Sequence, residues 1–196
     1  MIFLNQTALW PLPHWLQIAV VLAWLGVVGG IAEGLRRWAN ADSEMTRKVV
    51  HIGAGHVIVL AWWLQTPPWM GIAAGMLFGA IALISYQLPV LPGINSVGRF
   101  SLGTFFYAVS IGVLTAIFWP PHLYAFAALG VLIMTWGDGL AAIVGQNLGR
   151  HGYKIGDIQK SWEGSLAMFF ASVVVGWLVL GVSQGFSLLG LGQAVV

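Results

Sequence analysis

Residues Leu123–Val144 read LYAFAALGVLIMTWGDGLAAIV, an apolar run interrupted by a single acid, Asp138. A helix needs about 20 apolar residues to cross the hydrocarbon core of a bilayer, so this run is long enough to span one. The whole chain shares this character: 59% of its 196 residues are hydrophobic and 7% are charged, with a mean hydropathy of +0.87. Soluble domains usually carry about 25% charged residues. The sequence therefore predicts an integral membrane protein.

Further apolar stretches precede and follow this run. The predicted spans are Trp15–Ala32, His51–Leu64, Trp69–Tyr86, Gly103–Phe118, Leu123–Val144 and Leu166–Gly181. The second is short unless the residues just before it also belong to the helix. We therefore predict an all-α fold, a polytopic transmembrane helical bundle of about six spans that forms one domain over residues 1–196.

The basic residues lie between alternate pairs of spans, and the other connections hold none. They are Arg36, Arg37, Arg47, Lys48, Arg99, Arg150, Lys154 and Lys160. Because connections rich in Lys and Arg stay in the cytoplasm, this pattern places these connections there and both termini outside. Several tryptophans then fall near the outer interface, as in an aromatic belt. They are Trp10, Trp15, Trp62, Trp63, Trp69 and Trp119.

The third span carries glycine at every fourth position. Gly71, Gly75 and Gly79 form two overlapping G-x-x-x-G steps, a pattern that lets two helix backbones approach closely. We predict that this face packs against another helix.

Several functional classes are excluded by what the sequence lacks. Cysteine is absent, which excludes disulfides, thiolate metal sites and a cysteine nucleophile. The net charge of +2 is too small to indicate nucleic-acid binding. The sequence contains no G-x-x-x-x-G-K-[ST] or H-E-x-x-H motif, which removes P-loop and zincin sites.

Asp138 is the acid that membrane topology alone does not explain. A lone carboxylate in a span costs a few kcal/mol and is a functional candidate by default, unless it is shallow enough to reach cytoplasmic water. Asp138, Ala141, Gly145 and Gly149 share one helix face by their spacing. This small-residue face allows the close approach of a bulky ligand or of another helix backbone.

A polar segment follows, Gly149–Gly164, with the sequence GRHGYKIGDIQKSWEG. Its cations and glycine amides suit polyphosphate oxygens, and its carboxylates suit a magnesium ion that bridges them. The alternative is a solvated cytoplasmic loop that only fixes topology. The residues indicate a magnesium–phosphate centre at the cytoplasmic interface.

A second charged segment, Glu33–Lys48, precedes the second span. Most of it is interpreted as a solvated loop. Arg47, Lys48 and His51 differ because they fall within about one and a half helical turns. They indicate either a phosphate-binding group or a positive-inside anchor with an interfacial histidine. His56 lies too far around the helix to form a metal pair with His51, so we expect it to be packed or hydrogen-bonded.

Four motifs in this order resemble the polyprenol kinase family. They are RKVVHIG at 47–53, GRFSLGT at 98–104, GDGLAAIVG at 137–145 and KSWEGS at 160–165. This family includes phytol, farnesol and dolichol kinases and CTP-dependent diacylglycerol kinase, with phosphatidate cytidylyltransferase as a distant relative. The resemblance covers roughly residues 45–180, and KSWEGS is most similar to the phytol kinase branch.

The resemblance implies transfer of a phosphoryl group from CTP to the hydroxyl of a membrane-dissolved isoprenoid alcohol, with phytol preferred. In phototrophs this reaction returns chlorophyll-derived phytol towards tocopherol. The alcohol would enter from the bilayer and the nucleotide from the cytoplasm, in a bacterial inner or thylakoid membrane. A homo-oligomer is compatible with this interpretation, and no nucleic-acid partner is expected.

The resemblance also implies roles for individual residues. Asp138, Glu163 and Lys160 would be catalytic, with Asp138 and Glu163 holding magnesium and one of these two carboxylates accepting the alcohol proton. The nucleotide and its phosphates would contact Arg47, Lys48, His51, Arg150, Lys154, Ser161, Ser165, Gly145 and Gly149.

Relatives continue into a further helix with a glutamate, then an Asp-Asn segment and a Val-Pro, which this sequence lacks. We expect either a C-terminal truncation relative to the family or a partner subunit that supplies the helix. Alternative functions are a lipid-phosphate cytidylyltransferase, a small transporter coupled through Asp138, or an assembly subunit without enzymatic activity. The absence of an internal repeat argues against the transporter.

Overall fold

The computed structural model describes residues 12–39, 41, 43–87, 102–156 and 158–186. Arg99, Asp42, Trp10 and most of the GRFSLGT motif lie outside the described residues. The described chain forms two compact units, one that ends at Ala127 and one that begins at Ala128. The predicted single domain over residues 1–196 stays a prediction.

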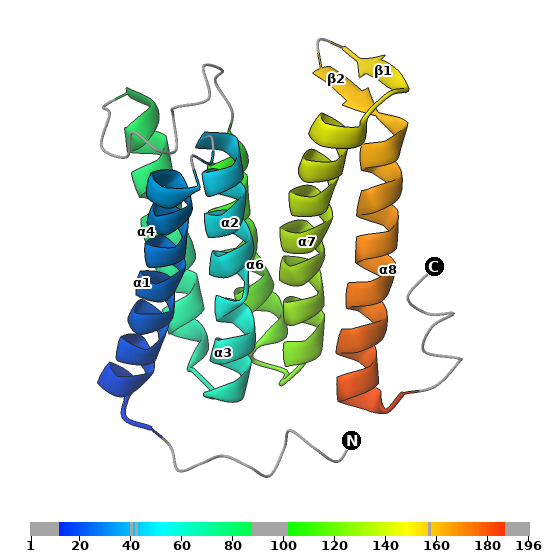
Figure 1. The fold of residues 1–196 in the computed structure, drawn as a ribbon. Coiled ribbons are helices and arrows are strands. Elements are labelled where there is room, and N and C mark those ends of the chain that lie inside the picture. Colours follow the sequence, from blue (N-terminus) through cyan, green and yellow to red (C-terminus); the bar gives the residue numbers. More distant parts are fainter. Residues whose placement is uncertain (1–11, 40, 42, 88–101, 157, 187–196) are drawn as a thin grey trace. The chain divides into compact units, whose positions relative to one another are not determined.

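The first unit is entirely helical in its described part. Its helices are α1 (His14–Trp38), α2 (Ser43–Gly55), α3 (Val57–Trp63), α4 (Pro68–Gln87) and α6 (Gly103–Phe118). The chain turns back between α1 and α2, so Arg36 and Arg37 in the last turn of α1 lie at the same end of the unit as Arg47 and Lys48 (Figure 1). The clustering of cations predicted from alternate connections is present within this unit.

The part of Glu33–Lys48 interpreted as a solvated loop is helical at both ends, because α1 continues to Trp38 and α2 begins at Ser43. A loop was wrong there, while Arg36 and Arg37 are exposed, as expected of a solvated segment. Glu33 lies in α1, and its carboxylate accepts hydrogen bonds from Arg36 at 2.8 and 2.6 Å and from Arg37. Pairs of opposite charge three and four residues apart stabilise a helix, which lets α1 continue past its apolar part.

The predicted second span is interrupted at His56, between α2 and α3. The His56 backbone N–H donates to Gly53 O at 3.2 Å, and its ring Nδ1–H donates to Ile52 O at 2.8 Å. The side chain thus takes the carbonyl that a regular helix would pair with the backbone N–H of the same residue. The expected hydrogen-bonded role of His56 is confirmed.

Hydrogen bonds along α1 fix the helices that follow it. Trp24 Nε1 donates to Gly53 O at 2.8 Å, and the buried Gln17 donates through Nε2 to Leu64 O at 3.1 Å. A Cβ on Gly53 would lie 2.4 Å from a methyl carbon of Val28, so only glycine allows this approach of α2 to α1.

The glycine face of α4 packs against α6, as the G-x-x-x-G pattern predicted. A Cβ on Gly75 would lie 2.7 Å from Gly112 Cα, and one on Gly71 would lie 2.6 Å from Thr115 Cγ2. Just beyond α6, the buried Trp119 donates through Nε1 to Thr66 O at 2.8 Å. Trp119 is therefore part of the core of this unit, and its place near the outer interface stays a prediction.

Substitution of Gly75 by alanine is expected to lower the free energy of unfolding by about 1–3 kcal/mol, because the added methyl group meets backbone that cannot yield. Gly26→Ala on α1 is the matched control, since a Cβ there meets nothing within 4 Å. This control should be neutral or slightly stabilising, because alanine favours helix more than glycine does. Unfolding of the purified proteins in detergent measures both, and equal stability of the two variants would contradict the prediction.

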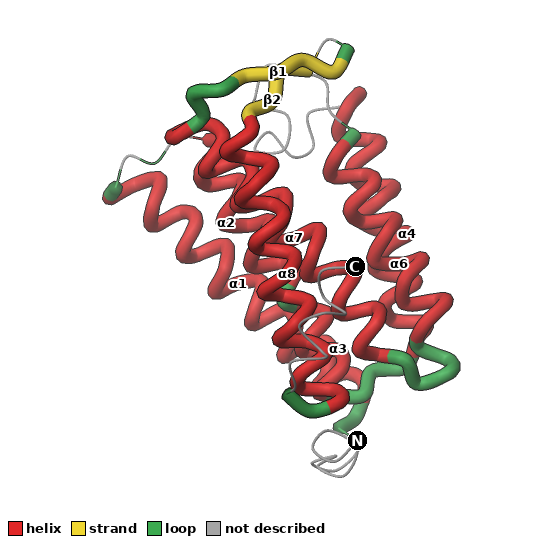
Figure 2. Tube along the Cα trace, turned by 90° about the vertical axis from the view of Figure 1, so that its right-hand side faces the viewer, coloured by secondary structure: helices red, strands yellow, loops and turns green. Residues whose placement is uncertain are grey.

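The second unit contains a β-hairpin that the all-α prediction missed. After α7 (Tyr124–Leu148), whose first residues belong to the first unit, come β1 (Gly152–Ile155), β2 (Ile158–Ser161) and α8 (Trp162–Gln184). Figure 2 shows the hairpin at the joined ends of α7 and α8, with β2 leading directly into α8. The strands are antiparallel, and Gly156 has φ +59°, a value that favours glycine.

Four helices of the described chain are long and apolar enough to cross a membrane: His14–Trp38, Pro68–Ser85, Tyr124–Leu148 and Trp162–Gln184. They coincide with the first, third, fifth and sixth predicted spans. The fourth predicted span is α6, with 16 residues, and the second is divided between α2 and α3. The protein is a helical membrane protein, while the count of six spans and the outside location of both termini stay predictions.

Candidate functional site

The C-terminal end of α7 and the N-terminal end of α8 approach each other through glycine. A Cβ on Gly164 would lie 2.7 Å from Ala141 O and 3.2 Å from Gly145 Cα, and one on Gly149 would lie 2.9 Å from Ser161 Oγ. Ala141, Gly145 and Gly149, the small residues of this α7 face, thus lie against the start of α8. Close packing against another helix was one of the two alternatives predicted for these small residues. Phosphate binding by Gly145 and Gly149 stays a prediction.

Ser161 begins α8 as its N-cap. Its backbone is extended, with φ −129° and ψ 149°, and its Oγ accepts a hydrogen bond from Gly164 N at 3.2 Å. This is the capping geometry expected of serine, and it satisfies one of the free N–H groups of the first turn. The N–H of Trp162 is also satisfied, by His151 O at 3.0 Å. Two of the backbone N–H groups at this end are therefore already hydrogen-bonded within the protein.

Ser165 fastens the hairpin to α8. Its Oγ donates a hydrogen bond to Ser161 O at 3.1 Å. In the second hydrogen bond of Ser165, at 2.7 Å, the Tyr153 hydroxyl is therefore the donor and Ser165 Oγ the acceptor. A serine hydroxyl has one proton, which this arrangement uses. The structure gives Ser165 a role within the protein, and its predicted phosphate contact is untested.

The Glu163 carboxylate is hydrogen-bonded to His151, which lies in the segment that joins α7 to β1. This carboxylate accepts hydrogen bonds from the His151 backbone N at 3.2 and 3.3 Å, and Oε1 lies 2.6 Å from His151 Nδ1. A carboxylate in the first turn of a helix is also favoured by the partial positive charge of that end. These contacts fix the carboxylate at the hairpin end of α8.

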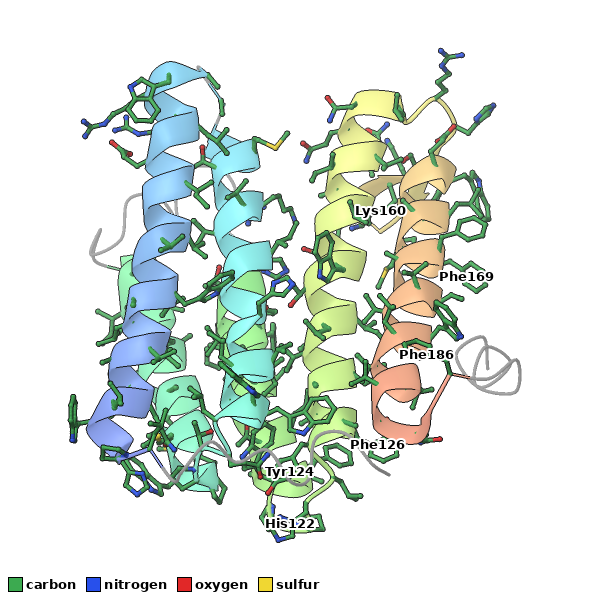
Figure 3. The ribbon with its side chains drawn as sticks, turned by 60° about the horizontal axis from the view of Figure 1, so that its bottom comes forward. His122, Tyr124, Phe126, Lys160, Phe169 and Phe186 are labelled. Carbon is green, nitrogen blue, oxygen red and sulfur yellow. The ribbon has the colours of Figure 1, made fainter. Side chains whose placement is uncertain are left out.

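The hairpin separates its two lysines by face. Lys160 pairs with Tyr153 and Lys154 with Gln159, and directly paired residues of antiparallel strands point to the same side of the sheet. The Tyr153 side chain contacts α8. Lys160 therefore projects from the face of the hairpin that carries this contact, and Lys154 projects from the opposite face. Lys160 lies at the hairpin end of α7, and Tyr124 marks the other end of that helix (Figure 3).

Asp138 lies deeper along α7 than the hairpin. It is exposed, between the buried Gly137 and Gly139, and is separated from Gly145 by seven residues or about 10 Å of helix. Side chains tilt towards the N-terminus of their own helix, so Asp138 leans away from the hairpin and Glu163 leans towards it. The two predicted magnesium ligands thus lean in opposite directions along their helices, and their shared binding of one ion stays a prediction.

The fit to magnesium depends on one or two carboxylates. The described residues contain no group of three or more His, Asp or Glu side chains that could hold a metal. Magnesium commonly uses one or two carboxylates together with substrate phosphates and water, so Asp138 alone provides a suitable protein ligand. A shared role of Glu163 in holding the ion stays a prediction.

The predicted phosphate ligands before the second span belong to the first unit. His51 lies against Tyr107, with 4.3 Å between ring centroids, and Tyr107 OH donates to His51 O at 3.5 Å. Lys48 is buried, and Arg47 is half-buried beside it on α2. Their assignment to the same site as the second unit's residues stays a prediction, as does that of the exposed Arg150.

Two residues of this site were missed at the sequence level, Tyr153 and His151. A signal for them was available: tyrosine and isoleucines alternate with polar residues on either side of a Gly-Asp pair, a pattern typical of a hairpin. The partners of these residues lie 12 positions away in the chain, which no local pattern reveals.

Comparison with known proteins decides the family. The chain is 49% identical over 178 residues to a protein of Synechocystis sp. named "Phytol kinase". The matched residues cover 91% of this chain and 76% of the relative. The chain belongs to the phytol kinase family. It is also 30% identical over 183 residues to "Probable phytol kinase 2, chloroplastic" of Oryza sativa subsp. japonica, covering 82% of this chain and 59% of that protein. No family model and no solved structure matches the chain.

Family membership confirms the resemblance drawn from the four motifs, and the phytol kinase branch within it. It also confirms the predicted enzyme class, a kinase that phosphorylates an alcohol. Such a reaction requires a nucleotide donor and a lipophilic alcohol, in keeping with the apolar helices that carry the site.

Proposed function

We propose that this chain transfers the γ-phosphate of CTP to the hydroxyl of phytol, forming phytyl phosphate and CDP, and thereby returns phytol towards tocopherol. The identity to the Synechocystis phytol kinase supports the alcohol. The observation that carries the proposal is the position of KSWEGS: it runs from β2 into the capped first turn of α8, where a cationic hairpin meets two long apolar helices.

This position suits two substrates of opposite polarity. Phytol is dissolved in the bilayer and reaches the site along apolar helix surface, which on α8 includes the exposed Phe169 and Phe170. A nucleotide triphosphate arrives from water and needs cations, which the hairpin end supplies through Arg150, Lys154 and Lys160. We place this end at the cytoplasmic face, because it holds the cations of the second unit.

The reaction is an in-line displacement. The phytol oxygen attacks the γ-phosphorus, the bond from that phosphorus to the β–γ bridging oxygen breaks, and CDP leaves with the electron pair. The hydroxyl proton passes to a carboxylate, Asp138 or Glu163, and then to water. Positioning and neutralisation of phosphate charge supply most of the rate enhancement in such reactions.

The residues divide these tasks. Lys160 neutralises oxygens of the donor phosphates, with Arg150 as a further contact. Lys154, on the opposite face of the hairpin, adds only its general positive charge. Ser161 orders the start of α8 as its N-cap. Asp138 would hold magnesium, and the ion when bound would reduce the charge on the phosphate oxygens under attack.

The test is an assay of the purified chain in lipid nanodiscs with γ-labelled CTP, ATP, UTP or GTP. The acceptors are phytol, geranylgeraniol, farnesol and diacylglycerol. We expect label in phytyl phosphate, with CTP as the best donor. Label recovered in pyrophosphate, when a lipid phosphate is offered, would instead show a cytidylyltransferase. Binding of no nucleotide in the presence of magnesium would overturn the enzymatic proposal.

A further inference from the structure

We infer that Tyr153 is a positioning residue whose hydroxyl, bonded to Ser165, anchors the β1–β2 hairpin to α8 and thereby fixes Lys160 for the nucleotide phosphates. This inference rests on the proposed function. It adds a residue that does not touch the substrate but determines where a phosphate ligand stands.

The hairpin needs such an anchor. It has four residues in each strand, and Ile155, Ile158, Lys154 and Gln159 are all exposed. A two-stranded hairpin of this size is at best marginally stable in water by itself. Tyr153 is half-buried, which distinguishes it from the other residues of β1.

Tyr153 holds the hairpin by two contacts with the first turn of α8. Its hydroxyl lies 2.7 Å from Ser165 Oγ, and its ring centroid lies 5.2 Å from that of Trp162. Ser165 in turn donates to Ser161 O, at the junction of β2 and α8. Both strands are thus tied to one helical turn, β1 through Tyr153 and β2 through the chain itself.

Because Tyr153 is paired with Lys160, the anchor on β1 also fixes the backbone position of Lys160 on β2. Tyr153 and Lys160 are directly paired, so their side chains leave the same face of the hairpin. A lysine side chain is long and flexible, and its ammonium group is placed only as well as its backbone is. Loss of the tyrosine hydroxyl should therefore weaken nucleotide binding without any direct contact between Tyr153 and the nucleotide.

Tyr153→Phe removes the hydroxyl and keeps the ring against Trp162. We expect it to raise the KM for CTP by about 3- to 10-fold, the effect of one lost hydrogen bond, while the KM for phytol stays within about twofold. Ser165→Ala should do the same, and the double variant should be no worse than the stronger single variant, because both remove one interaction. Tyr124→Phe, at the other end of α7, is the control and should match the wild type.

A second comparison shows whether Tyr153 acts through Lys160. In a Lys160→Met background, Tyr153→Phe should change the KM for CTP by less than about twofold, since the positioned group is gone. A full effect in that background would overturn the inference. So would an unchanged KM for CTP in Tyr153→Phe, or equal increases in the KM values of CTP and phytol, which would indicate general loss of structure.

Failure of the proposed function can be distinguished from failure of the anchor. A wild-type chain that phosphorylates none of the alcohols would overturn the proposed function alone. The anchor is then judged by amide hydrogen exchange over residues 152–161. Exchange should be faster in Tyr153→Phe and Ser165→Ala than in the wild type and Tyr124→Phe. Identical exchange in all four proteins would overturn the anchoring.

Discussion

Replacement of Asp138 by asparagine is expected to lower kcat/KM for phosphoryl transfer by at least about 100-fold, a loss typical of removing one charge from a phosphoryl-transfer site. Asparagine has nearly the same shape and keeps one carbonyl oxygen. It lacks the negative charge that would hold magnesium, and it cannot accept the alcohol proton. The measurement is the rate of phytyl phosphate formation from γ-labelled CTP in nanodiscs.

The same substitution should not lower stability. Asp138 is the one acid of the 25-residue helix α7, and a carboxylate in a membrane span carries a free-energy cost of about 2.5–3.5 kcal/mol. Its neutralisation should leave the unfolding temperature in detergent unchanged or raise it. Opposite effects on activity and stability are the signature of a residue retained for function.

Glu33→Gln is the matched control, because it also turns a carboxylate into an amide. Glu33 lies near the end of α1 and bonds Arg36 and Arg37 at the surface, so we expect activity within about twofold of the wild type. Wild-type turnover by Asp138→Asn would show that the site has been assigned to the wrong acid. Equal losses in both variants would point to a general effect of charge on the protein.

Replacement of Lys160 by methionine is expected to lower kcat/KM by about 10- to 100-fold, through loss of a charge-assisted hydrogen bond to phosphate. Methionine keeps most of the length and volume of the side chain. The loss should appear mainly in the KM for CTP if Lys160 binds the ground state, and in kcat if its contact strengthens in the transition state. Either result supports a phosphate contact, and an unchanged kcat/KM would refute it.

Lys154→Met is the control that the hairpin itself provides. Lys154 has the same charge and lies in the adjacent strand, but its pairing with Gln159 places it on the opposite face from Tyr153. We expect its loss to change kcat/KM by less than about threefold, the general effect of one solvent-exposed charge. A larger loss in Lys154→Met than in Lys160→Met would reverse the assignment of the two faces.

Much of the fold could be predicted because membrane insertion depends on local composition. The runs that became α1, α4, α7 and α8 were recognisable by length and hydropathy alone. The packing of α4 through Gly71 and Gly75 was recognisable from their spacing, since residues four apart share one helix face. Composition was less informative for Glu33–Lys48, where local ion pairs carry α1 beyond its apolar part.

The sequence by itself determined the membrane class, the clustering of cations and the family, because each depends on neighbouring residues or on short motifs. Only the tertiary structure decided which residues of KSWEGS and the preceding segment face one another. Tyr153 with Ser165, and His151 with Glu163, meet because β1 folds back onto β2 beside the start of α8. Hydrogen bonds between such distant positions depend on the path of the backbone, which hydropathy and spacing do not encode. The same folded path places Glu163 beside His151 at the start of α8, and leaves Asp138 within α7, seven residues or about 10 Å of helix before Gly145.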